Sequence, residues 1–197
     1  MTLLPILAEK LSSALLPFST DRFTPRDAQL PAVPGKVHAI IGMRRAGKTT
    51  FLRQLQAQQR NESGPETAIY LSFDDDRLVN LDLAQLGFLI EDYYRRFPSH
   101  RGGLTVRWLF DEIQYVDGWE RFVRRILDSE NVEIFVSGSS ARMLSREVHT
   151  SLRGRGLPTV IHPFSFREFL RHRSEEPPGE PRSWTPGDRS LIERRFR

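Results

Sequence analysis

A short run of residues has the types and spacing needed to hold phosphate groups. Residues 42–49 read GMRRAGKT and fit the pattern G-x-x-x-x-G-K-[ST]. Glycines allow the backbone to curl so that successive N–H groups point at one anion, and a helix beginning near Lys48 adds its positive dipole end. Lys48 would reach the β- and γ-phosphates, and the Thr49 hydroxyl would ligate Mg²⁺. We therefore expect a nucleotide to bind through Gly42, Met43, Arg44, Arg45, Ala46, Gly47, Lys48, Thr49 and Thr50.

An acidic pair farther along the chain supplies the other half of this chemistry. Asp111 and Glu112 come directly after the mostly apolar segment VRWLF at 106–110. An aspartate at a strand end can hold Mg²⁺, and a glutamate beside it can deprotonate an attacking water. A small-molecule kinase would exclude that water, and the sequence lacks the Asn-Lys-x-Asp motif with which GTPases read guanine. The pair therefore favours ATP hydrolysis, with Thr49 and Asp111 as metal ligands and Glu112 and Lys48 as catalytic residues.

Three serines follow the fourth predicted strand and are candidates for sensing the γ-phosphate. Ser137, Ser139 and Ser140 belong to the segment SGSSA at 137–141. Such a strand often lies between the first and third strands of the sheet, so that its end faces the phosphate. We choose Ser139 as the catalytic sensor. The alternative is that Ser139 or Ser140 only caps a helix that begins at Ala141.

A run of three aspartates, residues 74–76, closes the second predicted strand. We interpret this run as a solvated acidic turn at a strand end. The alternative is that one aspartate orders Arg44 or Arg45 beside the phosphates.

The chemistry requires a framework that brings strand ends together. Strands separated by helical crossovers form a parallel sheet that helices cover on both faces, and its ligand site lies at the carboxyl ends of the strands. We therefore predict an α/β fold with a doubly wound, parallel, five-stranded sheet. The predicted strands are 36–41, 67–73, 106–110, 132–138 and 157–162, and the predicted helices are 1–18, 49–60, 81–97, 118–130, 139–148, 165–173 and 189–197.

Composition limits the class of protein. Of the 197 residues, 39% are hydrophobic and 27% are charged, and no apolar run is long enough to span a membrane. The chain has no cysteine, which excludes disulfides and thiolate metal sites and makes the cytoplasm the expected location. A net charge of +4 would suit a nucleic-acid partner, but the arginines are spread along the chain and form no specific motif.

Six ordered segments resemble the bacterial and archaeal AAA+ ATPases of the AAA-14 type. They are GMRRAGKTT (42–50), YLSFDDDRL (70–78), WLFDEIQ (108–114), VSGSSARML (136–144), LRGRG (152–156) and HPFSFREFL (162–170). The resemblance implies a P-loop NTPase core of the ASCE type with a Mg–ATP site. It implies no physiological substrate. Proteins of this type are often fused to a C-terminal DUF4143 domain.

We divide the chain into three parts. An N-terminal helix and lead-in segment occupy 1–35, the P-loop ATPase core occupies 36–173, and a proline-rich linker with the start of a C-terminal region occupies 174–197. Proteins similar to this one are considerably longer. We therefore expect the chain to be a fragment of a longer protein.

The segment SLRGRG, at 151–156, contains two arginines before the fifth predicted strand. In AAA+ proteins this region can carry an arginine finger that stabilises γ-phosphate charge on a neighbouring subunit. Arg155 is our candidate for this catalytic role and Arg153 is the substitute, whereas the alternative is an ordinary surface loop. A finger acting on a neighbour requires self-association, which we expect of a longer form.

Three functions remain in view. The first is a Mg²⁺-dependent ATP-binding and ATP-hydrolysing AAA+-like module whose partner is unknown. The second is a nucleotide-binding interaction module with little hydrolysis, associated with DNA through its arginines. The third is a P-loop phosphotransferase. Glu112 separates the first from the third, and a steep salt dependence of DNA binding would support the second.

Overall fold

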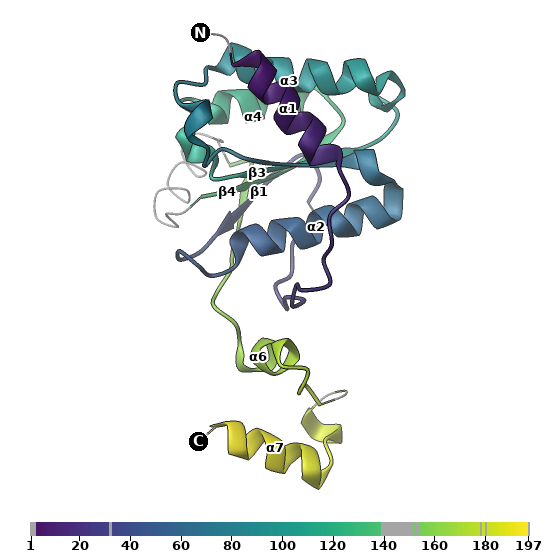
Figure 1. Cartoon of the computed structure of the whole chain (residues 1–197), viewed down its shortest axis with the longest axis vertical. Helices are drawn as coiled ribbons and strands as arrows, with labels where there is room; N and C mark the ends of the chain where they lie inside the picture. Colours follow the sequence, from purple (N-terminus) through teal and green to yellow (C-terminus); the bar gives the residue numbers. More distant parts are fainter. Residues whose placement is uncertain are drawn as a thin grey trace. The chain divides into compact units, whose positions relative to one another are not determined.

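The computed structural model describes residues 3–31, 33–138, 152, 154–177, 179 and 181–196. The chain forms two compact units, both drawn in Figure 1. Unit 1 comprises Met1–Phe23 with Ala28–Pro163, and unit 2 comprises Thr24–Asp27 with Phe164–Arg197. None of the helices in the described part of the chain is both long and apolar enough to cross a membrane.

The centre of unit 1 is a sheet of five parallel strands in the spatial order β2-β3-β4-β1-β5. The strands are β1 (Val37–Ile41), β2 (Ala68–Ser72), β3 (Val106–Asp111), β4 (Val132–Ser137) and β5 (Gly156–Val160). Every residue of β1 is buried, as expected for an inner strand whose sheet is covered on both faces. The predicted five-stranded parallel sheet is confirmed, and β4 lies between β1 and β3 as expected.

Helices cover both faces of this sheet (Figure 1). The α-helices in the described part of unit 1 are α1 (Leu4–Leu15), α2 (Lys48–Ser63), α3 (Leu83–Arg96) and α4 (Trp119–Ser129). Helices α1, α3 and α4 pack on one face and α2 packs on the other. In α1, the buried residues Leu7, Leu11 and Ala14 recur at helical spacing, so the predicted amphipathic packing helix is confirmed. The 3₁₀ helices are η1 (Pro65–Thr67), η2 (Asp76–Leu78), η3 (Pro98–His100) and η4 (Ile113–Tyr115).

Alternation along β3 determines which way the acidic pair faces. Trp108 and Phe110 pack in the cluster beneath α1, α3 and α4, whereas Leu109 packs in the cluster beneath α2. Successive side chains of a strand point to opposite faces, so Asp111 at the end of β3 lies on the same face as Leu109. The strand therefore directs this carboxylate toward α2 and the loop that precedes it.

One predicted helix cannot be compared with the structure, and another begins at a different residue. The helix predicted at 139–148 lies outside the described residues. The C-terminal helix α7 (Pro186–Phe196) begins earlier than the predicted start at 189. Proline suits the first helical position because its missing N–H has no partner there in any case. Asp188 strengthens this start by accepting a hydrogen bond from the Thr185 N–H at 2.8 Å.

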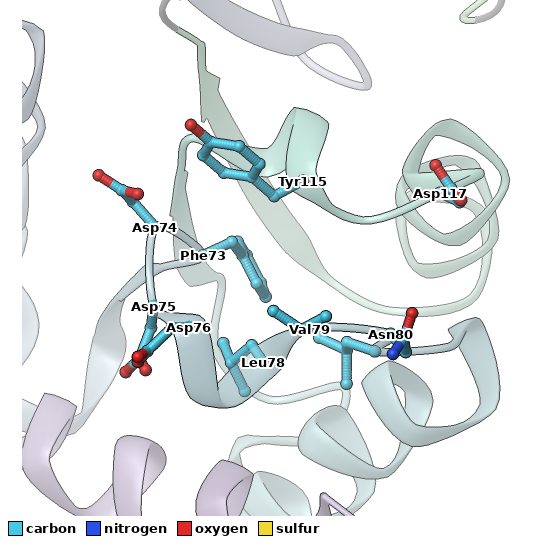
Figure 2. Close-up of a pocket in the computed structure, with 10 residues that line it drawn as sticks. Phe73, Asp74, Asp75, Asp76, Leu78, Val79, Asn80, Tyr115 and Asp117 are labelled. Atoms are coloured by element: carbon cyan, nitrogen blue, oxygen red, sulfur yellow. The ribbon is translucent and has the colours of Figure 1, made fainter.

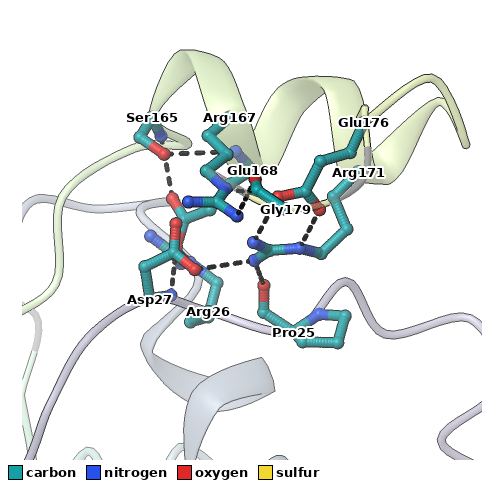
Figure 3. Close-up of polar contacts among 9 residues, drawn as sticks. All are labelled: Pro25, Arg26, Asp27, Ser165, Arg167, Glu168, Arg171, Glu176 and Gly179. Atoms are coloured by element: carbon teal, nitrogen blue, oxygen red, sulfur yellow. Dashed lines mark hydrogen bonds and ion pairs between the residues drawn. The ribbon is translucent and has the colours of Figure 1, made fainter. Parts of the chain in front are cut away.

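Unit 2 is organised around the carboxylate of Glu168 in α6 (Phe166–His172), as Figure 3 shows. One carboxylate oxygen accepts hydrogen bonds from Arg26 Nε at 2.9 Å and from the Asp27 N–H at 2.8 Å, and the other accepts from the Ser165 N–H at 2.8 Å. The Arg26 and Glu168 side chains are only 3% and 5% exposed. Burial opposes ionisation, but the hydrogen bonds prevail and hold the pKa of Glu168 at about 2.

A second arginine strengthens the same link (Figure 3). Arg171 forms ion pairs with Glu176 at 2.6 Å and with Asp27 at 2.9 Å, and it donates to the carbonyl oxygen of Pro25 at 2.6 Å. The remaining short element of unit 2 is the 3₁₀ helix η5 (Pro181–Ser183). The segment Thr24–Asp27 is thus bonded to α6, although it precedes that helix by most of the chain.

We predict that Glu168→Gln destabilises unit 2 by about 3 kcal/mol at neutral pH, because it removes a carboxylate whose pKa is depressed in the folded state. This stabilisation is complete above the ordinary glutamate pKa and is lost as the pH falls through about 2. The variant and the natural chain should therefore converge in acid. Hydrogen exchange of the α6 amides, corrected for intrinsic rates, measures both effects. Glu193→Gln, an exposed change in α7, is the control, and an equal loss in that variant would contradict the prediction.

Candidate functional site

The loop between β1 and α2 depends on glycine at both ends. Gly42 follows β1 with a φ of 154°, and Gly47 precedes α2 with a left-handed φ of 94°. Residues with a Cβ rarely adopt such angles. A Cβ on Gly42 would also overlap the backbone carbonyl oxygen of Ile161, directly after β5. The glycines therefore let the loop turn tightly while one side of it contacts the neighbouring strand.

Lys48 is the first residue of α2 and is only 6% exposed. Its ammonium group donates to the carbonyl oxygens of Gly42 and Met43, both at 3.2 Å. Among the described residues, no carboxylate forms an ion pair with Lys48. Two neutral carbonyls compensate a buried cation only in part, so an anion at this loop would be attracted to it.

Further positive potential surrounds the start of α2. Arg44 and Arg45 are exposed on the loop. The first N–H groups of a helix have no carbonyl partner within it, and the helix dipole adds positive charge at the same end. Across the described segments, no backbone carbonyl accepts from the N–H of Lys48 or Thr49. The loop and the helix start therefore form a surface suited to phosphate oxygens.

Three hydroxyl groups converge on the carboxylate of Asp111, which is 2% exposed. Thr49 Oγ1 donates to Oδ2 at 2.7 Å, and the Tyr70 hydroxyl donates to the same oxygen at 2.6 Å. Ser137 Oγ donates to Oδ1. These donors come from α2, β2 and β4 and offset the cost of burying a charge. Asp111 therefore joins the phosphate loop to the centre of the sheet.

Tyr70 belongs to this cluster, although the sequence did not indicate it. The Arg53 guanidinium stacks over its ring, 3.6 Å from the centroid. Burial, together with the nearby Asp111 carboxylate, raises the pKa of Tyr70 well above its ordinary value. The hydroxyl therefore stays protonated and remains a donor to Asp111 across the physiological pH range.

Glu112 adopts a left-handed backbone conformation, with a φ of 54°, between β3 and η4. Its N–H donates to Ser137 Oγ at 3.3 Å, and its carboxylate accepts from Gln114 Nε2 at 2.6 Å. A residue with a Cβ in this conformation is uncommon and is typical of positions where the chain must aim a side chain. A side chain of β4 therefore fixes the Glu112 backbone, and a side chain of η4 fixes the Glu112 carboxylate.

The oxygen atoms in this cluster fit a hard divalent cation. The Thr49 hydroxyl and the Asp111 carboxylate are hydrogen-bonded to each other at 2.7 Å. Mg²⁺ commonly takes one or two oxygen ligands from a protein and completes its shell with water and phosphate oxygens. In the part of the chain that the structure describes, no group of three or more His, Cys, Asp or Glu residues could hold a metal alone. The donor set therefore suits Mg²⁺ that arrives with a nucleotide.

Other predicted site residues are placed differently. Ser139, the predicted sensor, lies outside the described residues, as does Arg153. Ser137 is fully buried and donates inward to Asp111. Arg155 lies immediately before β5, where its carbonyl accepts from the first residue of β1, and its guanidinium pairs with Asp128. It is therefore at the amino edge of the sheet, opposite the loop of its own chain.

In the structure, the aspartate run at residues 74–76 contacts α1 and η2. Asp75 pairs with Lys10 at 2.7 Å and with Arg77 at 3.0 Å. Among the described residues, no ion pair joins the run to Arg44 or Arg45, and the alternative that one aspartate orders these arginines beside the phosphates stays a prediction. The pairing with Lys10 links the acidic turn to α1.

Comparison with known proteins relates the chain to one family. A family model, AAA_14, described as an AAA domain, matches residues 34–170. An uncharacterized Methanocaldococcus jannaschii protein, MJ1544, is 42% identical over 76% of this chain and 31% of its own length. An uncharacterized Haemophilus influenzae protein is 34% identical over 70% of this chain and 34% of its own length. The chain thus spans about a third of these relatives.

Among solved structures, that of C. elegans PCH-2 aligns with 81% of this chain and 41% of its own chain. The TM-score is 0.45 and the sequence identity is 14%.

We predict that Gly42→Ala lowers the free energy of unfolding by about 3 kcal/mol, because backbone strain adds to overlap with the Ile161 carbonyl. Gly35→Ala is the matched control. Gly35 also has a positive φ, of 68°, but a Cβ there meets no atom within 4 Å. It should cost only about 1 kcal/mol. Urea denaturation measures both variants, and equal losses would show that the close approach of β5 does not matter.

Proposed function

Because the chain belongs to the AAA_14 family of AAA domains, which are nucleotide-binding modules, we propose that it binds and hydrolyses ATP with Mg²⁺. The predicted AAA-14 relationship is confirmed. The fusion to a DUF4143 domain stays a prediction. The chain spans about a third of its curated relatives, so the activity and partners of the whole protein belong to this proposal.

One contact carries the proposal. Thr49 Oγ1 lies 2.7 Å from Asp111 Oδ2, so the residue after the loop lysine meets the first member of the acidic pair. These side chains come from distant parts of the sequence. Their meeting is what a nucleotide site with a shared Mg²⁺ requires, because a phosphate loop and a strand-end carboxylate must reach the same cation.

The surrounding residues support binding of a triphosphate. Lys48 would exchange the carbonyls of Gly42 and Met43 for β- and γ-phosphate oxygens, whose full charges attract an ammonium more strongly. The N–H groups at the start of α2 would donate to the same phosphates. Thr49 and Asp111 would hold Mg²⁺, which when bound neutralises phosphate charge. Adenine as the base rests on the family and on the missing guanine motif.

Glu112 is the proposed general base. Gln114 engages its Oε2 at 2.6 Å, which leaves Oε1 to accept a proton from water. The hydrogen bond from the Glu112 N–H to Ser137 Oγ fixes the backbone position from which the Glu112 side chain extends. A phosphotransferase would instead need an acceptor site that excludes water at this point. We therefore prefer hydrolysis to phosphotransfer.

The proposed arginine finger requires a neighbouring chain. Arg155 lies at the amino edge of the sheet and pairs with Asp128, so it would have to leave that partner to act on a nucleotide in another subunit. We keep this role, and the self-association it requires, as a proposal for a longer form. Ser139 also stays a proposed sensor. The lack of cysteine supports a cytoplasmic location.

We predict that Lys48→Ala weakens Mg–ATP binding by about a hundredfold or more, because a buried cation is removed from the phosphates. Isothermal titration calorimetry measures the affinity. Lys36→Ala is the matched control, since Lys36 is a half-buried lysine outside the 42–49 loop that donates to the Gly154 carbonyl at 2.8 Å. Unchanged affinity in a folded Lys48→Ala chain would exclude the phosphate site.

We predict that Glu112→Gln spares ATP affinity and lowers turnover by about a hundredfold or more, the usual contribution of a general base. Glutamine has nearly the same shape and can still accept from Gln114. Phosphate release under saturating ATP measures the rate, and Glu120→Gln in α4 is the control. A wild-type rate in the variant would place the base elsewhere. ATP binding without turnover in the natural chain would favour a nucleotide-binding interaction module.

A further inference from the structure

A pocket of about 460 Å³ opens in unit 1 (Figure 2). It lies between the turn after β2, which includes η2, and the turn after β3, which includes η4. Its volume is within the usual range for ligand pockets. The chemistry assigned to the nucleotide uses neither its acidic nor its apolar lining residues.

The floor and the mouth of the pocket are apolar. Phe73 and Leu78 are buried in its floor, whereas Val79 and Tyr115 are 64% and 61% exposed. Figure 2 shows Tyr115 on one side, Leu78 and Val79 on the other, and Phe73 between them. Exposed apolar and aromatic side chains around a pocket are typical of a surface that receives a partner.

Negative charge lies on two sides of this apolar centre. Asp74, Asp75 and Asp76 are on one side and Asp117 is on the other (Figure 2). Asp75 is already paired with Lys10 and Arg77, but within the described ranges Asp74, Asp76 and Asp117 form no ion pair. None of the described residues that line the pocket is basic. The pocket therefore presents uncompensated carboxylates around an apolar floor.

We propose that this pocket binds a segment of a partner protein in which basic residues flank an apolar one. Arginine and lysine have apolar stems and cationic ends, so they can contact the floor while their charges reach the carboxylates. The exposed ring of Tyr115 can also stack against a guanidinium. Phosphate-rich partners such as nucleic acids are repelled by the same carboxylates, and one small cation would leave the apolar floor uncovered.

The position of the pocket connects such a partner to the ATP cycle, a step that rests on the proposed function. Tyr115 is the last residue of η4, and Glu112 is the residue that precedes this turn. Gln114, between them, donates to the Glu112 carboxylate at 2.6 Å. A segment pressed against Tyr115 therefore contacts the short turn that holds the proposed base, and the bound peptide should change the rate of ATP turnover.

The test measures peptide binding in the absence of nucleotide, so that it succeeds or fails independently of ATP hydrolysis. The probe is a fluorescein-labelled nonapeptide with an Arg-Leu-Arg centre, followed by fluorescence anisotropy. The double change Asp74→Asn and Asp76→Asn should weaken binding by about tenfold, and Tyr115→Ala should weaken it similarly. Asp21→Asn, a change of an exposed aspartate elsewhere in unit 1, should leave binding unchanged. A peptide with a Glu-Leu-Glu centre should not bind.

Each other result would overturn the proposal. Equal binding of the two peptides would mean that charge is not recognised, and unchanged binding by the Asp74 and Asp76 double variant would place the site elsewhere. If the basic peptide does not bind when the protein is in about 100-fold excess over the labelled peptide, a protein segment of this chemistry is excluded. Sedimentation velocity adds one further arm: self-association that disappears in the double variant would assign the pocket to a second copy of this chain.

Discussion

Burying the Asp111 carboxylate at the end of β3 requires hydrogen-bond donors from its neighbours, because no cation pairs with it among the described residues. A carboxylate left without such donors would be strongly destabilising. The three hydroxyls come from Thr49, Tyr70 and Ser137. Hydrogen bonds to the two carboxylate oxygens of Asp111 therefore help to fix the register of β2, β3 and β4 and the position of the start of α2. The constraint that stabilises the sheet is therefore the same one that holds the candidate metal ligands together.

Much of this arrangement could be predicted from the sequence. The loop between β1 and α2 could be predicted from the spacing of Gly42, Gly47, Lys48 and Thr49, because these residues are close together in the sequence. The apolar runs, with helical segments between them, were enough to predict the parallel sheet. Asp111 was found because it ends such a run. Each of these features depends on residues that are close together in the sequence. A pattern read along the sequence is therefore enough to predict them.

Features formed by distant residues could not be predicted in this way. Tyr70 contacts Asp111 only because β2 pairs with β3, where Tyr70 lies opposite Leu109 and so faces α2. The acidic pocket likewise combines a turn after β2 with Tyr115 and Asp117 after β3. In the sequence, Tyr70 is one more β-forming residue in an apolar strand. Its role appears only when strand pairing is known.

The hydrogen bonds between Thr24–Asp27 and α6 determine when the second unit can form during protein synthesis. Arg26 and its partner Glu168 are 142 residues apart in the sequence. At ordinary rates of synthesis, a ribosome needs on the order of ten seconds to add that many residues. During this time the lead-in segment has emerged while α6 does not yet exist, and the sheet residues between them are being made. The second unit can therefore close only after nearly the whole first unit has left the ribosome, and its cationic Arg26 stays in water until then.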